Sequence, residues 1–157
     1  NPKIKNQYCK HNDSSLAFSE SAQHELDVLT DAVQEILRLT VEALEKDNDY
    51  ITCRIEPLEE VIDDMVLLLK NRHTDRLCKG ICNINAGLVF MDALTYFERT
   101  ADQCSSIAML ILGKKNEEIM KNHHLYLAEL HASGDKSYLA EKENRRVQYL
   151  VPLENNQ

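Results

Sequence analysis

The sequence predicts an all-α fold, a bundle of three long up-down helices followed by a C-terminal helical hairpin. Its 157 residues include only four glycines and three prolines, so residues that interrupt helices are scarce. Apolar residues recur at steps of three and four along much of the chain, which places them on one face of a helix. Helices of this kind bury their apolar faces against one another, and a bundle is expected.

Composition divides the chain into three regions. Residues 1–18 are polar and aperiodic, and we expect a flexible N-terminal arm there. Residues 19–152 carry the helical pattern and are expected to form one bundle domain. Pro152 is expected to close the ordered part, which leaves residues 153–157 as a disordered tail. Because the chain begins with Asn1 rather than Met, we expect a fragment or a processed product.

The first two long helices lie on either side of an acidic break at residues 47–49. The first is expected from residue 19 or 21 to residue 45, and the second from residue 49 to residue 72. The expected core residues are Leu26, Leu29, Val33, Ile36, Leu37, Thr40, Val41 and Leu44 in the first helix and Ile55, Leu58, Ile62, Met65 and Leu69 in the second. Pro57 either kinks the second helix or marks a restart in its first turn, and we favour a kink.

The remaining helices follow a connection around residues 73–82. A third long helix is expected over residues 83–112, with Gly113 as the glycine that follows its end. The hairpin is expected to consist of helices at residues 117–131 and 136–150, separated by Ser133-Gly134-Asp135. His124 and His131 share a face of the fourth helix, where we interpret them as surface or rim histidines.

Charge and apolar patterning exclude several classes of partner. A formal net charge of −8 disfavours a nucleic-acid surface, because phosphate binding needs clustered Lys and Arg. Apolar runs stop at four or five residues, well short of the roughly 20 that span a bilayer, so we expect no membrane insertion of this segment. Five cysteines, an odd number without a regular framework, favour free thiols over disulfides.

Two pairs of carboxylates are the strongest candidates for a functional site. Glu59 and Asp63 lie four residues apart on the second helix, and Glu98 and Asp102 repeat the spacing on the third. Residues at this spacing share one helical face, so the two helices could present both pairs to one cation. Carboxylate oxygens suit Mg, Ca, Mn or Fe ions. The alternative is that these carboxylates have no binding role and form a solvated acidic helix face.

Other chemical sites find little support in the sequence. No Glu-x-x-His motif for a ferritin-like di-iron centre occurs, and the spacing of Cys78 and Cys82 is only weakly typical of zinc ligands. The sequence also lacks a Gly-x-Ser-x-Gly elbow, a Walker-type phosphate loop and a Gly-rich dinucleotide fingerprint. We therefore expect a protein that is not an enzyme.

The segments FERTAD at residues 97–102 and SIA at residues 106–108 resemble the signature of the PhoU family. The resemblance covers three helices in order, from about residue 26 to residue 112. Residues 72–77, residues 80–82 and the C-terminal segment from Tyr126 to Pro152 look like the cytoplasmic PhoU-like domain of bacterial sodium-dependent phosphate cotransporters. The chain departs from the family pattern at Gln103, where His is common, and at Ser106, where Asn is common.

This resemblance implies a regulatory or accessory domain in phosphate transport. It also implies a divalent or trivalent metal ion (Fe, Zn, Mn or Mg) at the carboxylates of Glu59, Asp63, Glu98 and Asp102. The implied partners are a membrane-embedded transporter portion or other phosphate-uptake components, and a homodimer is possible on the same grounds. The implied location is the cytoplasm, with a tether to the inner face of the cell membrane.

Two other functions compete with this interpretation. One is a metal-independent helical interaction module, whose carboxylates would pair with Arg99, Arg72 or Arg76. The other is a metallohydrolase acting on phosphate esters, which needs an open coordination position and a general base. No residue in the sequence stands out as that base.

Overall fold

In the computed structural model, which describes residues 18–155, three long antiparallel helices form the bundle. They are α2 (Glu20–Lys46), α4 (Ile55–Cys78) and α5 (Ile84–Gly113), and each contacts the other two. A single helical turn, α3 (Asp49–Thr52), follows α2. The described residues contain no strand, and the all-α bundle expected from the sequence is confirmed.

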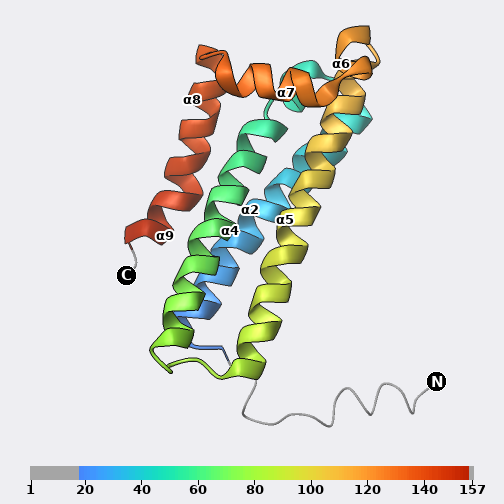
Figure 1. The fold of residues 1–157 in the computed structure, drawn as a ribbon. Helices are drawn as coiled ribbons and strands as arrows, with labels where there is room; N and C mark the ends of the chain where they lie inside the picture. The colour runs from blue at the N-terminus through green and yellow to red at the C-terminus, as the bar shows by residue number, and fades with distance from the viewer. Residues whose placement is uncertain (1–17, 156–157) are drawn as a thin grey trace, which may run out of the picture.

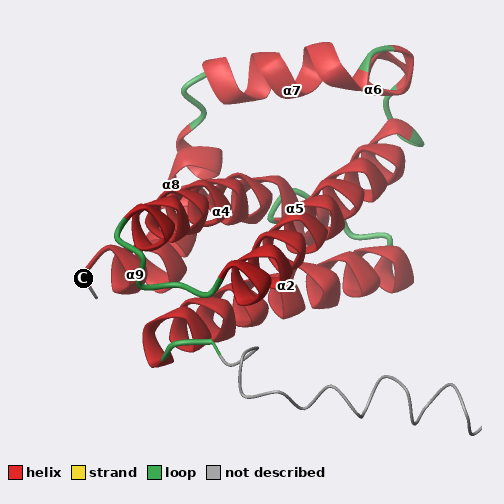
Figure 2. Cartoon of the chain, turned by 60° about the horizontal axis from the view of Figure 1, so that its bottom comes forward, coloured by secondary structure: helices red, strands yellow, loops and turns green. Residues whose placement is uncertain are grey.

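The C-terminal helices fold back onto the bundle. A short α6 (Glu117–Lys121) leads into α7 (His123–Ala132), which runs across the ends of the long helices rather than alongside them (Figures 1 and 2). After a turn, α8 (Lys136–Arg145), the π-helical η1 (Arg146–Leu150) and α9 (Val151–Asn155) descend beside α4. Helix α4 therefore has the rest of the bundle on one side and the C-terminal helices on the other.

The expected kink at Pro57 is wrong, because the chain restarts a helix there. Helix α3 ends at Thr52, and α4 begins at Ile55, so Pro57 lies in the first turn of α4. A backbone N–H in the first turn has no helical acceptor, and a proline is tolerated there at little cost. Helix α4 also extends beyond residue 72. It ends in a Schellman motif in which Gly80 adopts a φ of 66° and the N–H of Ile81 donates to Arg76 O at 3.0 Å.

The expected role of Gly113 and the single fourth helix are also corrected. Gly113 is the last residue of α5 itself and packs against Met120 of α6, whereas the residue after it, Lys114, has ordinary right-handed dihedrals. The fourth helix divides at Asn122, which has a φ of −153° and caps α7 by accepting the N–H of Leu125. Asn is well suited to such a cap because its side chain replaces a missing helical acceptor.

The predicted disordered tail is wrong over residues 153–155, which belong to α9. Pro152 is the second residue of that helix, and the wider π-helical turn before it relieves the clash between its ring and the preceding turn. Leu153 is fully buried, and its carbonyl accepts a hydrogen bond from Arg72 at 2.7 Å. Residues 156–157 and residues 1–17 of the predicted arm lie outside the described part of the chain. Phe18 packs edge-on against Phe90.

Leu153→Ala is expected to destabilise the protein by about 2–3 kcal/mol, because it removes a fully buried side chain and leaves a cavity. The free energy of unfolding in urea, followed by far-UV circular dichroism, measures the loss. Leu139→Ala on α8 is the matched control, since Leu139 is 47% exposed. Equal stability of the two variants would mean that α9 does not pack on the bundle.

Candidate metal centre

Helix α4 presents two carboxylate pairs on adjacent faces. Glu56 and Glu60 form one pair, and Glu59 and Asp63 form the other, shifted by three residues along the helix. The apolar residues between them (Leu58, Val61 and Ile62) are fully buried and fix the orientation of α4. The first pair faces α7 and α8, whereas the second comes close to a carboxylate of α5.

Glu59, Asp63 and Asp102 form the cluster that we call the tricarboxylate site. One carboxylate oxygen from each residue can be chosen so that the three lie within 4.8 Å of one another. Asp102 follows the fully buried Ala101 of α5, so the packing of α5 on α4 sets its position. Two helices thus supply three oxygen ligands to one small volume.

Among residues 18–155, the three carboxylates of the tricarboxylate site form no ion pair with a basic side chain. Burial raises the pKa of Glu59 to about 9, and the charges of Glu56 and Asp63 add to the rise. Burial likewise raises the pKa of Asp63 to about 6, with further contributions from Asp102 and Glu98. Asp63 Oδ1 is buried without a hydrogen-bond partner. Such a group is stabilised by taking up a proton or a cation.

The fourth predicted ligand, Glu98, lies apart from this cluster. Its Oε2 accepts a charge-assisted hydrogen bond from Lys70 Nζ at 2.6 Å, so a lysine of α4 already neutralises it. The arginine partners expected for the metal-independent module also lie elsewhere. Arg72 and Arg76 both pair with Glu25 of α2, at 3.3 and 2.8 Å.

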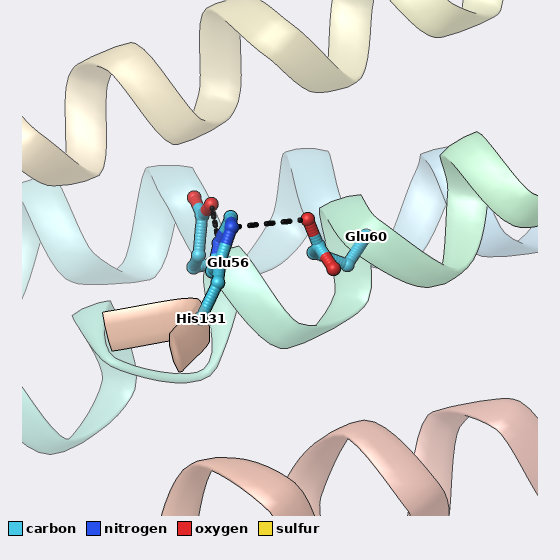
Figure 3. A group of neighbouring side chains, drawn as sticks. All are labelled: Glu56, Glu60 and His131. Atoms are coloured by element: carbon cyan, nitrogen blue, oxygen red, sulfur yellow. Dashed lines mark hydrogen bonds and ion pairs between the residues drawn. The ribbon is translucent and has the colours of Figure 1, made fainter. Parts of the chain in front are cut away.

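Glu56, Glu60 and His131 form a second cluster, which we call the histidine bridge (Figure 3). The imidazole of His131 lies between the two carboxylates, with Nε2 at 2.8 Å from Glu56 and Nδ1 at 3.3 Å from Glu60. Lys142 Nζ of α8 contacts the other oxygen of Glu60 at 2.5 Å. The hydroxyl of Ser105 donates to Glu56, which is only 3% exposed.

The two clusters differ in how their charge is compensated. In the histidine bridge, each carboxylate has a hydrogen-bond or ion-pair partner within the protein, and the contacts fasten α7 and α8 to α4. His131 is exposed, as expected of a surface or rim histidine, but the sequence did not predict its two carboxylate partners. The repeated Glu spacing in the sequence was a signal of the bridge, but the imidazole comes from 71 residues further along the chain. The carboxylates of the tricarboxylate site, in contrast, lie close to one another without a basic partner in the described part of the chain.

The chain matches the PhoU domain family over residues 26–111, which is more than half of its length. This chain belongs to the PhoU family. All three residues of the tricarboxylate site lie within the matched part, whereas His131 and Lys142 lie beyond it. Comparisons with curated proteins and with solved structures gave no match.

Membership of the PhoU family indicates a regulatory role in phosphate homeostasis, because the family consists of regulatory rather than enzymatic domains. Across residues 18–155, no helix has the length and apolar character needed to cross a membrane. The tricarboxylate site of this PhoU domain offers only oxygen ligands, which fits hard cations such as Mn²⁺, Mg²⁺ or iron better than it fits soft ones. Glu59, Asp63 and Asp102 are the residues that would hold such a cation.

Proposed function

We propose that this PhoU domain is a cation-responsive regulatory module in phosphate transport. The observation that carries the proposal is the tricarboxylate site, where Asp63 has a buried oxygen without a partner and Glu59 is held near two other carboxylates. A bound cation would join α4 to α5 and remove the repulsion between their acidic groups. Its arrival or loss would change how firmly these two helices are held together, which is a signal that a partner could sense.

Direct binding of Mn²⁺ tests the metal part of this proposal. Mn²⁺ is a suitable probe, because free and bound ions are distinguished by electron paramagnetic resonance and its ligand preference matches carboxylates. We expect Asp102→Asn to weaken Mn²⁺ binding at least about tenfold, since it removes one of three ligands. Asp92→Asn, at an exposed position of the same helix, should leave the affinity unchanged. Equal affinities in the two variants would overturn the assignment.

We further propose that the module serves a sodium-dependent phosphate cotransporter on the cytoplasmic side of the membrane, as part of its chain or beside it. The support is the resemblance of residues 72–77, residues 80–82 and the C-terminal segment to the cytoplasmic domain of such transporters. The coding sequence upstream of Asn1 is the decisive observation. Several apolar segments of about 20 residues there would establish attachment to a transporter. An upstream sequence without them would contradict attachment through the N-terminus.

A metal-independent interaction module is the second candidate. It is favoured by the histidine bridge and by the Lys70–Glu98 pair, in which acidic residues of this region contact basic side chains of the protein itself. Thermal melting with Mn²⁺ and with EDTA distinguishes the two functions. The cation-responsive module is expected to melt at a higher temperature with Mn²⁺, whereas the metal-independent module should melt at the same temperature in both.

A further inference from the structure

A cavity of about 470 Å³ lies where the C-terminal helices meet the bundle. Its walls come from α3 and the start of α4 on one side, from the end of α5, and from α7 and α8 on the other. Figure 1 shows α7 running across the ends of the long helices to the start of α8. The volume lies within the roughly 300–1,000 Å³ range of small-molecule sites. The cavity is separate from the tricarboxylate site, because none of the three residues of that site lines it.

The cavity has the mixed lining that small-molecule sites share. Met109, Leu112 and Leu130 supply apolar surface, and Tyr126 and Tyr138 supply aromatic rings. Tyr138 is 7% exposed, its ring stacks on that of His131, and its buried hydroxyl has no hydrogen-bond partner. An apolar or aromatic molecular body therefore has suitable surfaces to contact.

The charged side chains in the cavity wall indicate which sign of charge a ligand should carry. The only arginine of the lining, Arg54, is already paired with Glu141, whose carboxylate lies 2.9 Å from its Nε. Asp135 also lines the cavity; its Oδ1 accepts the backbone N–H groups of Ser137 and Tyr138, and it forms no ion pair among residues 18–155. The wall thus keeps an excess of carboxylate over guanidinium, which attracts cations and repels anions.

A tyrosine in the wall reports the same negative field. Burial raises the pKa of Tyr126 most, and the charges of Cys53, Asp135 and Glu56 add to the rise. Burial disfavours a charge of either sign, whereas the carboxylates of Asp135 and Glu56 disfavour an anion and favour a cation. Aromatic faces attract ammonium groups in addition, so Tyr126 and the carboxylate of Asp135 favour the same kind of ligand.

We propose that this cavity binds a small organic cation, an ammonium group carried on an aromatic or alkyl body. The ring or chain would contact the apolar wall of Met109 and Leu112, and the ammonium group would lie toward Asp135 and the tyrosine rings. The site is built by α7 and α8, which lie outside the matched PhoU region, together with parts of α3, α4 and α5. Because no residue of the tricarboxylate site lines it, the proposal does not depend on whether a metal binds there.

Three probes of similar size and different charge test the proposal with the full chain. Phenethylamine is cationic, phenethyl alcohol is neutral and phenylacetate is anionic, and saturation-transfer NMR and calorimetry measure their binding. We expect phenethylamine to bind at least about threefold more tightly than the alcohol, and phenylacetate to bind most weakly. Equal binding of all three probes, or tighter binding of phenylacetate, would overturn the proposal.

Substitutions in the wall locate the binding. Ala140→Trp is expected to fill the cavity and abolish phenethylamine binding, whereas Ala128→Trp, at an exposed position of α7 outside the lining, should not. Asp135→Asn keeps an oxygen that can cap α8 and is expected to weaken phenethylamine but not the alcohol. Asp75→Asn, at an exposed position outside the cavity, is its control. Unchanged phenethylamine binding in Asp135→Asn would contradict the proposal even if Ala140→Trp fails to fold.

Discussion

Glu25→Gln is expected to lower the free energy of unfolding by about 3–5 kcal/mol, because it breaks a buried ion-pair network and leaves two guanidinium groups without their carboxylate partner. Glu25 is 4% exposed on α2, and its carboxylate receives Arg76 at 2.8 and 3.1 Å and Arg72 at 3.3 Å. Both arginines belong to α4 and are themselves only 17% exposed. Urea unfolding followed by circular dichroism measures the loss.

A second glutamate of α2 provides the matched control. Glu42 also contacts two basic residues, Arg38 at 3.3 Å and Lys46 at 2.6 Å, but these contacts lie at the surface within one helix. Water replaces lost partners at an exposed site, so Glu42→Gln should change stability little. If Glu25→Gln cost no more than Glu42→Gln, burial of the network between α2 and α4 would contribute nothing, contrary to our interpretation.

Helical periodicity predicted the long helices because the same residues that set the period also form the core. Leu29 and Ile36 of α2 and Leu58, Ile62 and Met65 of α4 are all fully buried, as their spacing predicts. The exact register was harder to predict. Val41 and Leu44 are exposed, while Leu39 and Ala43 are buried, because the buried stripe of a helix depends on which neighbours it meets.

The errors arose where distant parts of the chain decide the local structure. Pro57 is compatible with a kink and with a restart, and the choice depends on the packing around the short α3. Leu153 follows a proline and precedes polar residues, so only its contact with the bundle reveals that it is buried. No local pattern could place the His131 imidazole between two glutamates of α4.

In the candidate site, too, local spacing was predictable and contacts between helices were not. The spacing of four residues correctly placed Glu59 and Asp63 on one face of α4. That Asp102 joins them, while Glu98 turns to Lys70, depends on the axial register of α5 against α4. Spacing within one helix carries no information about that register. Metal binding at these carboxylates remains a prediction that rests on their geometry and charge.

Glu59→Gln is expected to stabilise the metal-free protein at pH 8 by about 1–3 kcal/mol. The pKa of Glu59 is raised from 4.5 to about 9, so between these values the folded chain holds a proton that the unfolded chain releases. The contribution of Glu59 to stability is therefore complete below about pH 4.5 and is lost as the pH rises toward 9. A neutral glutamine mimics the protonated state at every pH. Urea unfolding with EDTA from pH 4.5 to 8 should show the advantage of the variant growing with pH.

A cation should reverse this order, because it binds the carboxylates that the glutamine lacks. Mn²⁺ at 100 times its dissociation constant would stabilise the wild-type chain by about 2.7 kcal/mol and the variant much less. Glu143→Gln, at an exposed position of α8, should resemble the wild type with EDTA and with Mn²⁺. Parallel pH profiles of Glu59→Gln and the wild type would show that Glu59 is ionised and solvated in the folded chain. Equal stabilisation of both by Mn²⁺ would place the cation elsewhere, whereas the reversed order would show that the carboxylates that repel one another without metal are the ones that bind it.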